Sequence, residues 1–130
     1  MRNYILNVIE DKITKSMVIN TLLQRNFCTN IEPFCVKGAV RVMRNLKEEL
    51  GLVIVEIEME GGPELIRIAK GEKVQGYQQL KGCEDVPIIL LGDSDTQNIV
   101  EYDSYFPKSS LRNFEGKENF ADAVARYLNK

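Results

Sequence analysis

Residues 52–59 read Leu52-Val-Ile-Val-Glu-Ile-Glu-Met59, and this stretch decides the fold class. Its first four side chains are apolar and mostly β-branched. A continuous apolar run of this kind is typical of a strand that is buried on both faces. Similar runs occur at residues 4–9 and 86–91. Strands with both faces covered belong mainly to parallel sheets, so the three runs predict an α/β domain.

Helical patterns lie between and after these strands. Residues 12–24 place apolar side chains four positions apart, and Asp11 stands where an N-cap residue belongs. Residues 37–50 and 117–128 also carry apolar side chains at helical spacing. Two weaker strands are expected at residues 29–34 and 104–106. Pro33 has no N–H to give to a neighbouring strand, so we expect residues 29–34 at a sheet edge.

The alternation of strands and helices predicts a parallel sheet with helices on both faces and right-handed crossovers. In such sheets the carboxyl ends of the strands meet at one edge, where functional residues are concentrated. The residues at those ends are Ile9-Glu10-Asp11, Glu56-Ile57-Glu58, Gly92-Asp93-Ser94 and Pro107-Lys108. We therefore expect a site that is rich in carboxylates and contains one lysine.

The length, net charge and composition of the chain exclude several classes of function. The chain has 130 residues, which predicts a single domain over residues 1–130. Its net charge is −2, so no basic excess attracts nucleic acid or an anionic membrane. Because the chain has no histidine, nucleophile activation by histidine and the usual zinc ligand sets are excluded.

The cysteines and the apolar runs bear on the cellular compartment. The three cysteines, Cys28, Cys35 and Cys83, show no C-x-x-C spacing, and we expect them as small buried side chains in a reducing environment. The apolar runs are too short to span a membrane, and no signal peptide is visible. These features favour a cytoplasmic protein.

Four strands of the chain, taken in order, resemble those of bacterial response-regulator receiver domains. Residues 52–59 are similar to the third strand of a receiver, which ends in the phosphorylated aspartate. Residues 86–92 are similar to the fourth strand, which ends in Thr or Ser, and residues 103–108 to the fifth, with its lysine and aromatic switch position. Residues 4–11 are similar to the first strand, which ends in two acids. The resemblance implies a flavodoxin-like, doubly wound, five-stranded parallel sheet with strand order 2-1-3-4-5.

Several site residues depart from the receiver pattern. Glu56 stands at the phosphoacceptor position in place of aspartate, and Gly92 stands at the Thr or Ser position. Ile9 takes the first acidic position, which leaves Glu10 and Asp11 as the acidic pocket. Phosphoryl transfer to a carboxylate needs a nucleophile at a fixed distance from Mg²⁺, and glutamate is one methylene too long. The resemblance thus implies a pseudo-receiver, in which the fold is kept and phosphorylation is lost.

Two positions match the receiver pattern: Lys108 corresponds to the fifth-strand lysine and Tyr105 to the aromatic switch. We expect Glu56 and Lys108 to form an ion pair, because an unpaired buried carboxylate is costly. We expect no catalytic residue and no cofactor. Glu10 and Glu56 are weak candidates for holding Mg²⁺, since two acids are few for a cation that demands octahedral oxygen geometry.

Two segments differ more widely from a receiver. Residues 63–80 predict a broken third helix, which Gly71 interrupts. Between Gly92 and Tyr105, only residues 96–102 have a helical pattern, so the fourth helix is expected to be stunted or unwound. In receivers the face formed by helix 4, strand 5 and helix 5 binds partners. We therefore expect a protein partner on strand 5 and the last helix.

The function that follows is a phosphorylation-independent, non-enzymatic signalling module in bacterial two-component signal transduction, acting through protein–protein interaction. One alternative is a phospho-accepting response regulator that uses a shifted acidic site. Another is a flavodoxin-like cofactor-binding protein, although a phosphate-binding Ser/Thr/Gly loop after the first strand is missing. The sequence leaves the partner, the oligomeric state and the conformation of residues 61–85 open.

Overall fold

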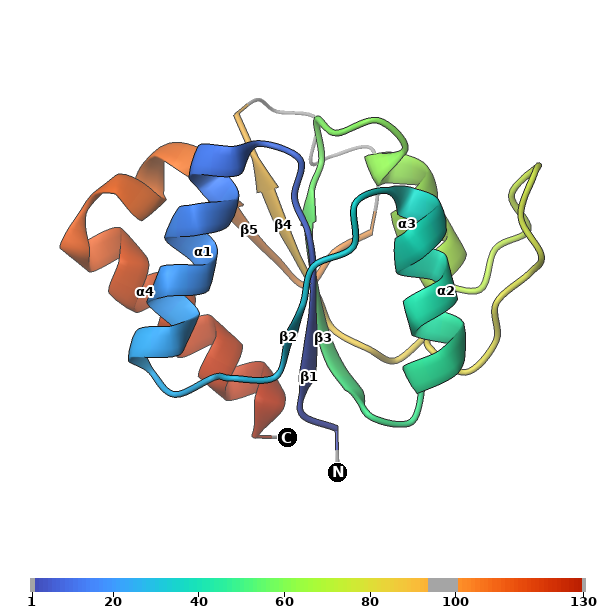
Figure 1. The fold of residues 1–130 in the computed structure, drawn as a ribbon, viewed down its shortest axis with the longest axis horizontal. Helices are drawn as coiled ribbons and strands as arrows, with labels where there is room; N and C mark the ends of the chain where they lie inside the picture. Colours follow the sequence, from blue (N-terminus) through green and yellow to red (C-terminus); the bar gives the residue numbers. More distant parts are fainter. Residues whose placement is uncertain (1, 94–100, 130) are drawn as a thin grey trace.

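The computed structural model describes residues 2–93 and 101–129. Five parallel strands form one sheet in the order β2-β1-β3-β4-β5, which confirms the predicted fold (Figure 1). The strands are β1 (Tyr4–Val8), β2 (Asn30–Ile31), β3 (Leu50–Glu56), β4 (Ile88–Gly92) and β5 (Ser104–Pro107). All seven residues of β3 are buried, as its continuous apolar sequence predicts.

Helices cover both faces of the sheet (Figure 1). They are α1 (Lys12–Gln24), α2 (Val36–Leu46), α3 (Gly62–Ala69) and α4 (Phe114–Leu128), with a 3₁₀ helix, η2, at Lys108–Arg112. Helices α1 and α4 pack on one face, and α2 and α3 pack on the other. Each face buries its own apolar core, and Phe120 of α4 is the largest fully buried side chain.

Both ends of residues 37–50 differ from the expected helix. Helix α2 begins one residue earlier, at Val36, and ends at Leu46, and β3 begins at Leu50. Leu50 therefore belongs to the sheet, although its spacing from Leu46 continues the helical pattern. The last helix begins at Phe114, three residues before the predicted start. In the strand expected at residues 29–34, only Asn30–Ile31 pair, at the sheet edge that Pro33 indicates.

The third helix is shorter than predicted. Helix α3 ends at Ala69, and residues 70–87 form neither helix nor strand, so the broken helix expected over residues 63–80 is wrong after its first two turns. Gly71 has a φ of +87°, a conformation that favours glycine and ends the helix. The segment is held by buried apolar side chains such as Val74 and Leu80, which pack into the core beneath α2 and α3. It is the long loop beyond α2 in Figure 1.

The expectations for the fourth strand, the cysteines and the fourth helix were met to different extents. The strand expected at residues 86–91 begins at Ile88 and continues to Gly92. Of the cysteines, Cys83 is buried, but Cys28 and Cys35 are exposed, which corrects the expectation that all three are core side chains. The short fourth helix expected at residues 96–102 lies almost wholly outside the described residues. Among those described, no helix is both long enough and apolar enough to cross a membrane.

Candidate functional site

The strand ends that the sequence singles out lie at one edge of the sheet, opposite the two chain termini (Figure 1). The parallel register pairs Val8 with Val55 and Glu56 with Leu91, and it places Gly92 beside Pro107. Lys108 follows Pro107 directly and opens the 3₁₀ helix η2. The ends of β1, β3, β4 and β5 therefore deliver their side chains to one small volume.

Glu56 is the centre of this site, and it is only 3 % exposed. Its Oε1 accepts hydrogen bonds from the backbone N–H groups of Glu10, at 2.7 Å, and Asp11, at 3.0 Å. Its Oε2 forms an ion pair with Nζ of Lys108, the pair that the sequence predicts. A buried carboxylate is tolerated when charged and polar donors surround it, and here three donors do so. Glu56 thereby ties the loop after β1 to the end of β5.

Lys108 is surrounded by three carboxylates. Besides Glu56, its Nζ lies 3.1 Å from Oε1 of Glu58 and 3.5 Å from Oδ2 of Asp93. The lysine side chain is 12 % exposed. Burial by itself would lower its pKa, but the hydrogen bonds and charges of Glu56 and Glu58 outweigh burial and raise the pKa well above its usual value. Lys108 is therefore a fixed positive charge at neutral pH.

The side chains of the predicted acidic pocket do not converge on Glu56. Ile9 is buried in the core beneath α1 and α4. Asp11 caps α1: its Oδ2 accepts from the backbone N–H of Thr14 at 3.1 Å and also from the Thr14 hydroxyl. These hydrogen bonds, the one from the hydroxyl first, lower the pKa of Asp11. Glu10 is exposed and lines a different hollow. What Glu10 and Asp11 contribute to the site is their backbone N–H groups.

Gly92 and Tyr105 are in direct contact. The Tyr105 hydroxyl donates to the carbonyl oxygen of Gly92 at 3.1 Å. A Cβ atom on Gly92 would lie 2.7 Å from Cγ2 of Ile57 and 2.8 Å from Oε2 of Glu58, which real Cβ atoms essentially never do. Close packing against Ile57 and Glu58 therefore leaves little room for a side chain at position 92.

The carboxylate oxygens at the centre of the site are already engaged in other contacts. Within residues 2–93 and 101–129, no three side chains of the histidine, cysteine, aspartate and glutamate types come together as metal ligands. Both oxygens of Glu56 are already bound, one by amides and one by an ammonium group. Mg²⁺ needs several hard oxygen ligands in near-octahedral geometry. Of the two weak candidates, Glu56 is engaged at both oxygens, and Glu10 lines a different hollow. Whether they hold Mg²⁺ stays a prediction.

Sequence reasoning passed over two side chains of the site, Glu58 and Asp93. Asp93 follows the last residue of β4, and Glu58 lies in the turn after β3. Both were among the strand-end residues, but only the structure shows that they reach Lys108. Because Glu58 lies in a turn, its spacing from Glu56 does not by itself predict the direction of its side chain. The two backbone amides that bind Glu56 leave no sequence signal.

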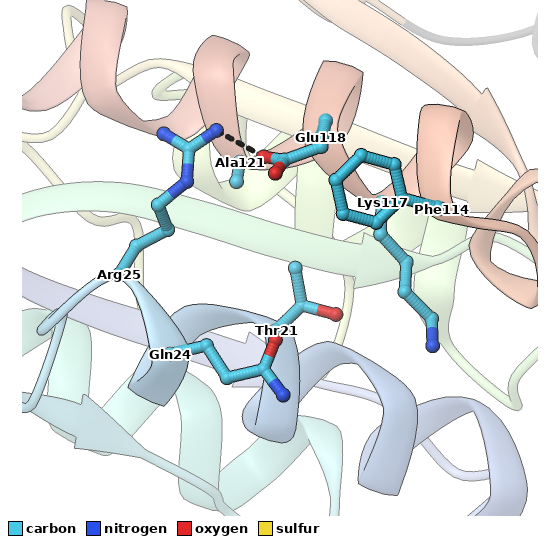
Figure 2. A pocket seen from close by; sticks show the side chains of 7 residues that line it. All are labelled: Thr21, Gln24, Arg25, Phe114, Lys117, Glu118 and Ala121. Carbon is cyan, nitrogen blue, oxygen red and sulfur yellow. Dashed lines mark hydrogen bonds and ion pairs between the residues drawn. The ribbon is translucent and has the colours of Figure 1, made fainter.

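A second feature near the last helix is a groove of about 270 Å³ between α1 and α4 (Figure 2). Thr21, Gln24 and Arg25 line it from α1 and its C-cap, and α4 supplies the facing side chains, of which Phe114 is 77 % exposed. Arg25 forms ion pairs with Glu118 and, at 2.8 Å, with Asp122. The groove thus combines an exposed aromatic ring with a charged rim.

The fold resembles solved receiver domains. No family model matches the chain, and no curated protein matches it in sequence. A signal receiver domain of a two-component histidine kinase from Clostridium thermocellum superposes with a TM-score of 0.73, 13% identity and full coverage of both chains. A response regulator from Thermotoga maritima gives 0.70 and 18% identity, again with full coverage of both. The BeF₃-activated DrrB receiver domain gives 0.70 and 20% identity with the same coverage. These likenesses establish the receiver-domain fold.

Proposed function

We propose that this chain is a phosphorylation-independent receiver-like signalling module that acts through protein–protein contact and is not an enzyme. The observation that carries the proposal is the state of Glu56, whose carboxylate is bound by the amides of Glu10 and Asp11 and by the ammonium group of Lys108. A nucleophilic carboxylate needs an oxygen free to attack phosphorus, and a metal to neutralise the transferring group. Glu56 has neither.

The same contacts support a single, permanent conformation. In a receiver, phosphorylation adds negative charge beside the strand-5 lysine. In this chain Glu56, Glu58 and Asp93 place three carboxylates around Lys108 without any covalent event. Gly92 has no hydroxyl that could follow a phosphoryl group, and Tyr105 is bonded to its carbonyl oxygen. The site therefore acts as a structural clamp rather than as a switch.

The partner is a protein, and we place its contact on the side formed by β5 and α4. The α1–α4 groove supports the α4 part of this placement, because an exposed aromatic ring beside charged residues is typical of an interface anchor (Figure 2); no residue of β5 lines the groove. A net charge of −2 gives no reason for direct binding to nucleic acid or to a membrane surface. The module would act in the bacterial cytoplasm, in two-component signal transduction.

The test is incubation of the purified chain with acetyl phosphate and Mg²⁺, followed by intact mass measurement. The expected result is an unchanged mass, with a phosphorylatable receiver domain as the positive control in the same buffer. Beryllofluoride with Mg²⁺ is expected to leave the amide signals of Glu10, Asp11 and Glu56 in place. An adduct of one phosphoryl group on Glu58, Asp93 or another strand-end acid would contradict the proposal and favour a phospho-acceptor with a shifted site.

A further inference from the structure

A hollow of about 490 Å³ opens at the N-terminal ends of α2 and α3. Helices α2 and α3 cover the face of the sheet opposite α1 and α4 (Figure 1), and the hollow shares no lining residue with the groove of Figure 2. Val36 and Met59, both buried, supply its apolar lining. Phe34 stands beside them, just before α2, and is 99 % exposed, the most exposed large apolar side chain among the described residues. The face of the Phe34 ring is therefore open to a group that enters the hollow.

The charge of the hollow is acidic. Glu10, Glu60 and Glu64 line it, against a single ammonium group from Lys37. Within the described part of the chain, the carboxylates of these three glutamates take part in no hydrogen bond or ion pair. They come from three separate segments: the loop after β1, the loop after β3 and the first turn of α3. Three segments thus bring carboxylates without an ion-pair partner to the lining of one hollow.

Two opposing electrostatic effects act in the hollow, and their balance decides whether it favours a cation or an anion. The N-terminus of α2, where Cys35 makes no side-chain cap, carries a partial positive charge of about +0.5 and favours an anion. Three carboxylates against one ammonium group outweigh that partial charge. A carboxylate set beside an exposed phenyl ring suits guanidinium and ammonium groups, which pair with the acids and stack on the ring face. The hollow therefore favours a cationic side chain that has an apolar side chain next to it.

We propose that this hollow is a docking site for a basic amphipathic segment of a partner protein. An arginine or lysine of that segment lies against Phe34 and pairs with Glu60 and Glu64, and an adjacent apolar side chain enters over Met59. This surface is distinct from the proposed contact on β5 and α4. Binding of a partner segment in the hollow is also independent of whether the chain is phosphorylated. It is nevertheless connected to Glu56, because Glu10 borders the hollow with its side chain and holds Glu56 with its backbone N–H.

The test uses the full chain and a nine-residue amidated peptide that alternates arginine and leucine. We expect saturable shifts of the amide signals of Phe34, Glu60 and Glu64, with a dissociation constant below about 1 mM, as suits a transient contact. The amides of Glu10 and Asp11 should shift at the same peptide concentration. A peptide with glutamate in place of arginine should cause no shift. Absence of saturation, or shifts confined to α1 and α4, would overturn the proposal.

Matched variants separate this hollow from general charge attraction. The double variant Glu60→Lys, Glu64→Lys should weaken peptide binding by at least about tenfold, because two attractive charges become repulsive. Phe34→Ala should weaken binding by about threefold or more through loss of the ring face. The controls are Glu115→Lys on α4 and Ile13→Ala on α1, where the isoleucine is 69 % exposed. Equal loss in variants and controls would overturn the proposal.

Self-association through the hollow is the competing occupancy, and the same variants test it. A chain that elutes as a dimer, and becomes a monomer with Phe34→Ala, would overturn the partner-segment proposal in favour of a second copy as the occupant. A monomer that binds the arginine–leucine peptide supports the proposal. Phosphorylation is tested separately, by the intact mass of the chain without peptide. If the peptide does not bind, the docking proposal fails and the proposed loss of phosphorylation is unaffected.

Discussion

The carboxylate of Glu56, at the end of β3, accepts a hydrogen bond of 2.7 Å from the backbone N–H of Glu10, just beyond β1. This contact joins the central strand to the loop that begins α1. The other oxygen of the same carboxylate holds Lys108, so one side chain connects three of the five strands at their carboxyl ends. Glutamate has the length to reach both groups, which gives this residue a structural role in its own right.

Loss of Glu56 should therefore destabilise the fold. Glu56→Ala leaves Lys108 without its closest partner and the two amides without their acceptor, and we expect a loss of about 3 kcal/mol in the free energy of unfolding. Urea denaturation of Glu56→Ala, Lys108→Ala and the double variant measures the coupling of the pair. Glu32→Ala, at an exposed glutamate between β2 and α2, is the control and should change stability by less than about 0.5 kcal/mol. A coupling energy near zero would show that the pair contributes nothing.

Gly92 should not tolerate a hydroxyl side chain. Gly92→Thr would press its Cβ against Ile57 and Glu58, and we expect a destabilisation of about 1–3 kcal/mol from the resulting displacement. Gly38→Ala in α2 is the matched control: its nearest neighbour would be 3.4 Å away, so alanine fits and favours the helix. If Gly92→Thr unfolds at the same urea concentration as the parent chain, the proposed packing constraint is wrong.

The strand runs show how far sequence alone predicts this fold. The continuous apolar sequence of residues 52–55 strongly favours a buried parallel strand. The order of the strands in the sheet was predicted from the resemblance of four strands to those of receiver domains. The prediction failed where the spacing of apolar residues is compatible with two kinds of secondary structure. Leu50 fits the pattern of α2 and also begins β3, and tertiary pairing with β1 decides between them. Likewise, residues 72–80 contain several helix-compatible residues, but Gly71 and Gly76 both have a positive φ, and Val74 and Leu80 pack into the core from the loop.

The site was predictable in part for a physical reason. Charged side chains at strand ends are visible in a sequence, so the pair of Glu56 and Lys108 could be inferred. Backbone N–H groups are present at every residue except proline, and a sequence does not reveal which of them point at a carboxylate. The amides of Glu10 and Asp11 therefore remained invisible, and their side chains were assigned to a pocket that they do not form.

The Asp11 cap should give the chain a measurable acid sensitivity. The pKa of Asp11 is lowered in the folded chain, chiefly by hydrogen bonds with Thr14. Its contribution to stability is therefore complete above the unfolded value of 3.8 and is lost as the pH falls through the lower folded pKa. Asp11→Ala should cost about 1 kcal/mol at pH 7. The difference between the parent chain and this variant should shrink below pH 3.8, measured by urea unfolding, and a constant difference down to pH 2 would contradict the prediction.

Lys108 should give the opposite dependence at alkaline pH. Its pKa is raised in the folded chain, so the stability it contributes is complete below the unfolded value of 10.5 and declines only as the pH rises above it. The stability difference between the parent chain and Lys108→Met should therefore be constant from pH 7 to about 10 and fall beyond that. Lys117→Met, on α4, is the control and should show a small difference throughout. A difference that disappears below pH 10 would mean that the carboxylates do not hold the lysine.

Shortening the central carboxylate is the most direct test of how Glu56 works. Glu56→Asp withdraws both oxygens by one methylene, so the carboxylate can no longer reach the amides of Glu10 and Asp11 while it keeps Lys108. We expect a destabilisation of about 1–2 kcal/mol, smaller than for Glu56→Ala, because one charge-assisted contact survives. The variant carries the residue type that receivers phosphorylate, yet Ile9 is buried in the core and offers no oxygen ligand, and Gly92 still has no hydroxyl. Its mass should therefore stay unchanged after treatment with acetyl phosphate and Mg²⁺. Uptake of one phosphoryl group by Glu56→Asp would show that the length of Glu56 alone blocks the chemistry, and that the surrounding site is more complete than its side chains indicate.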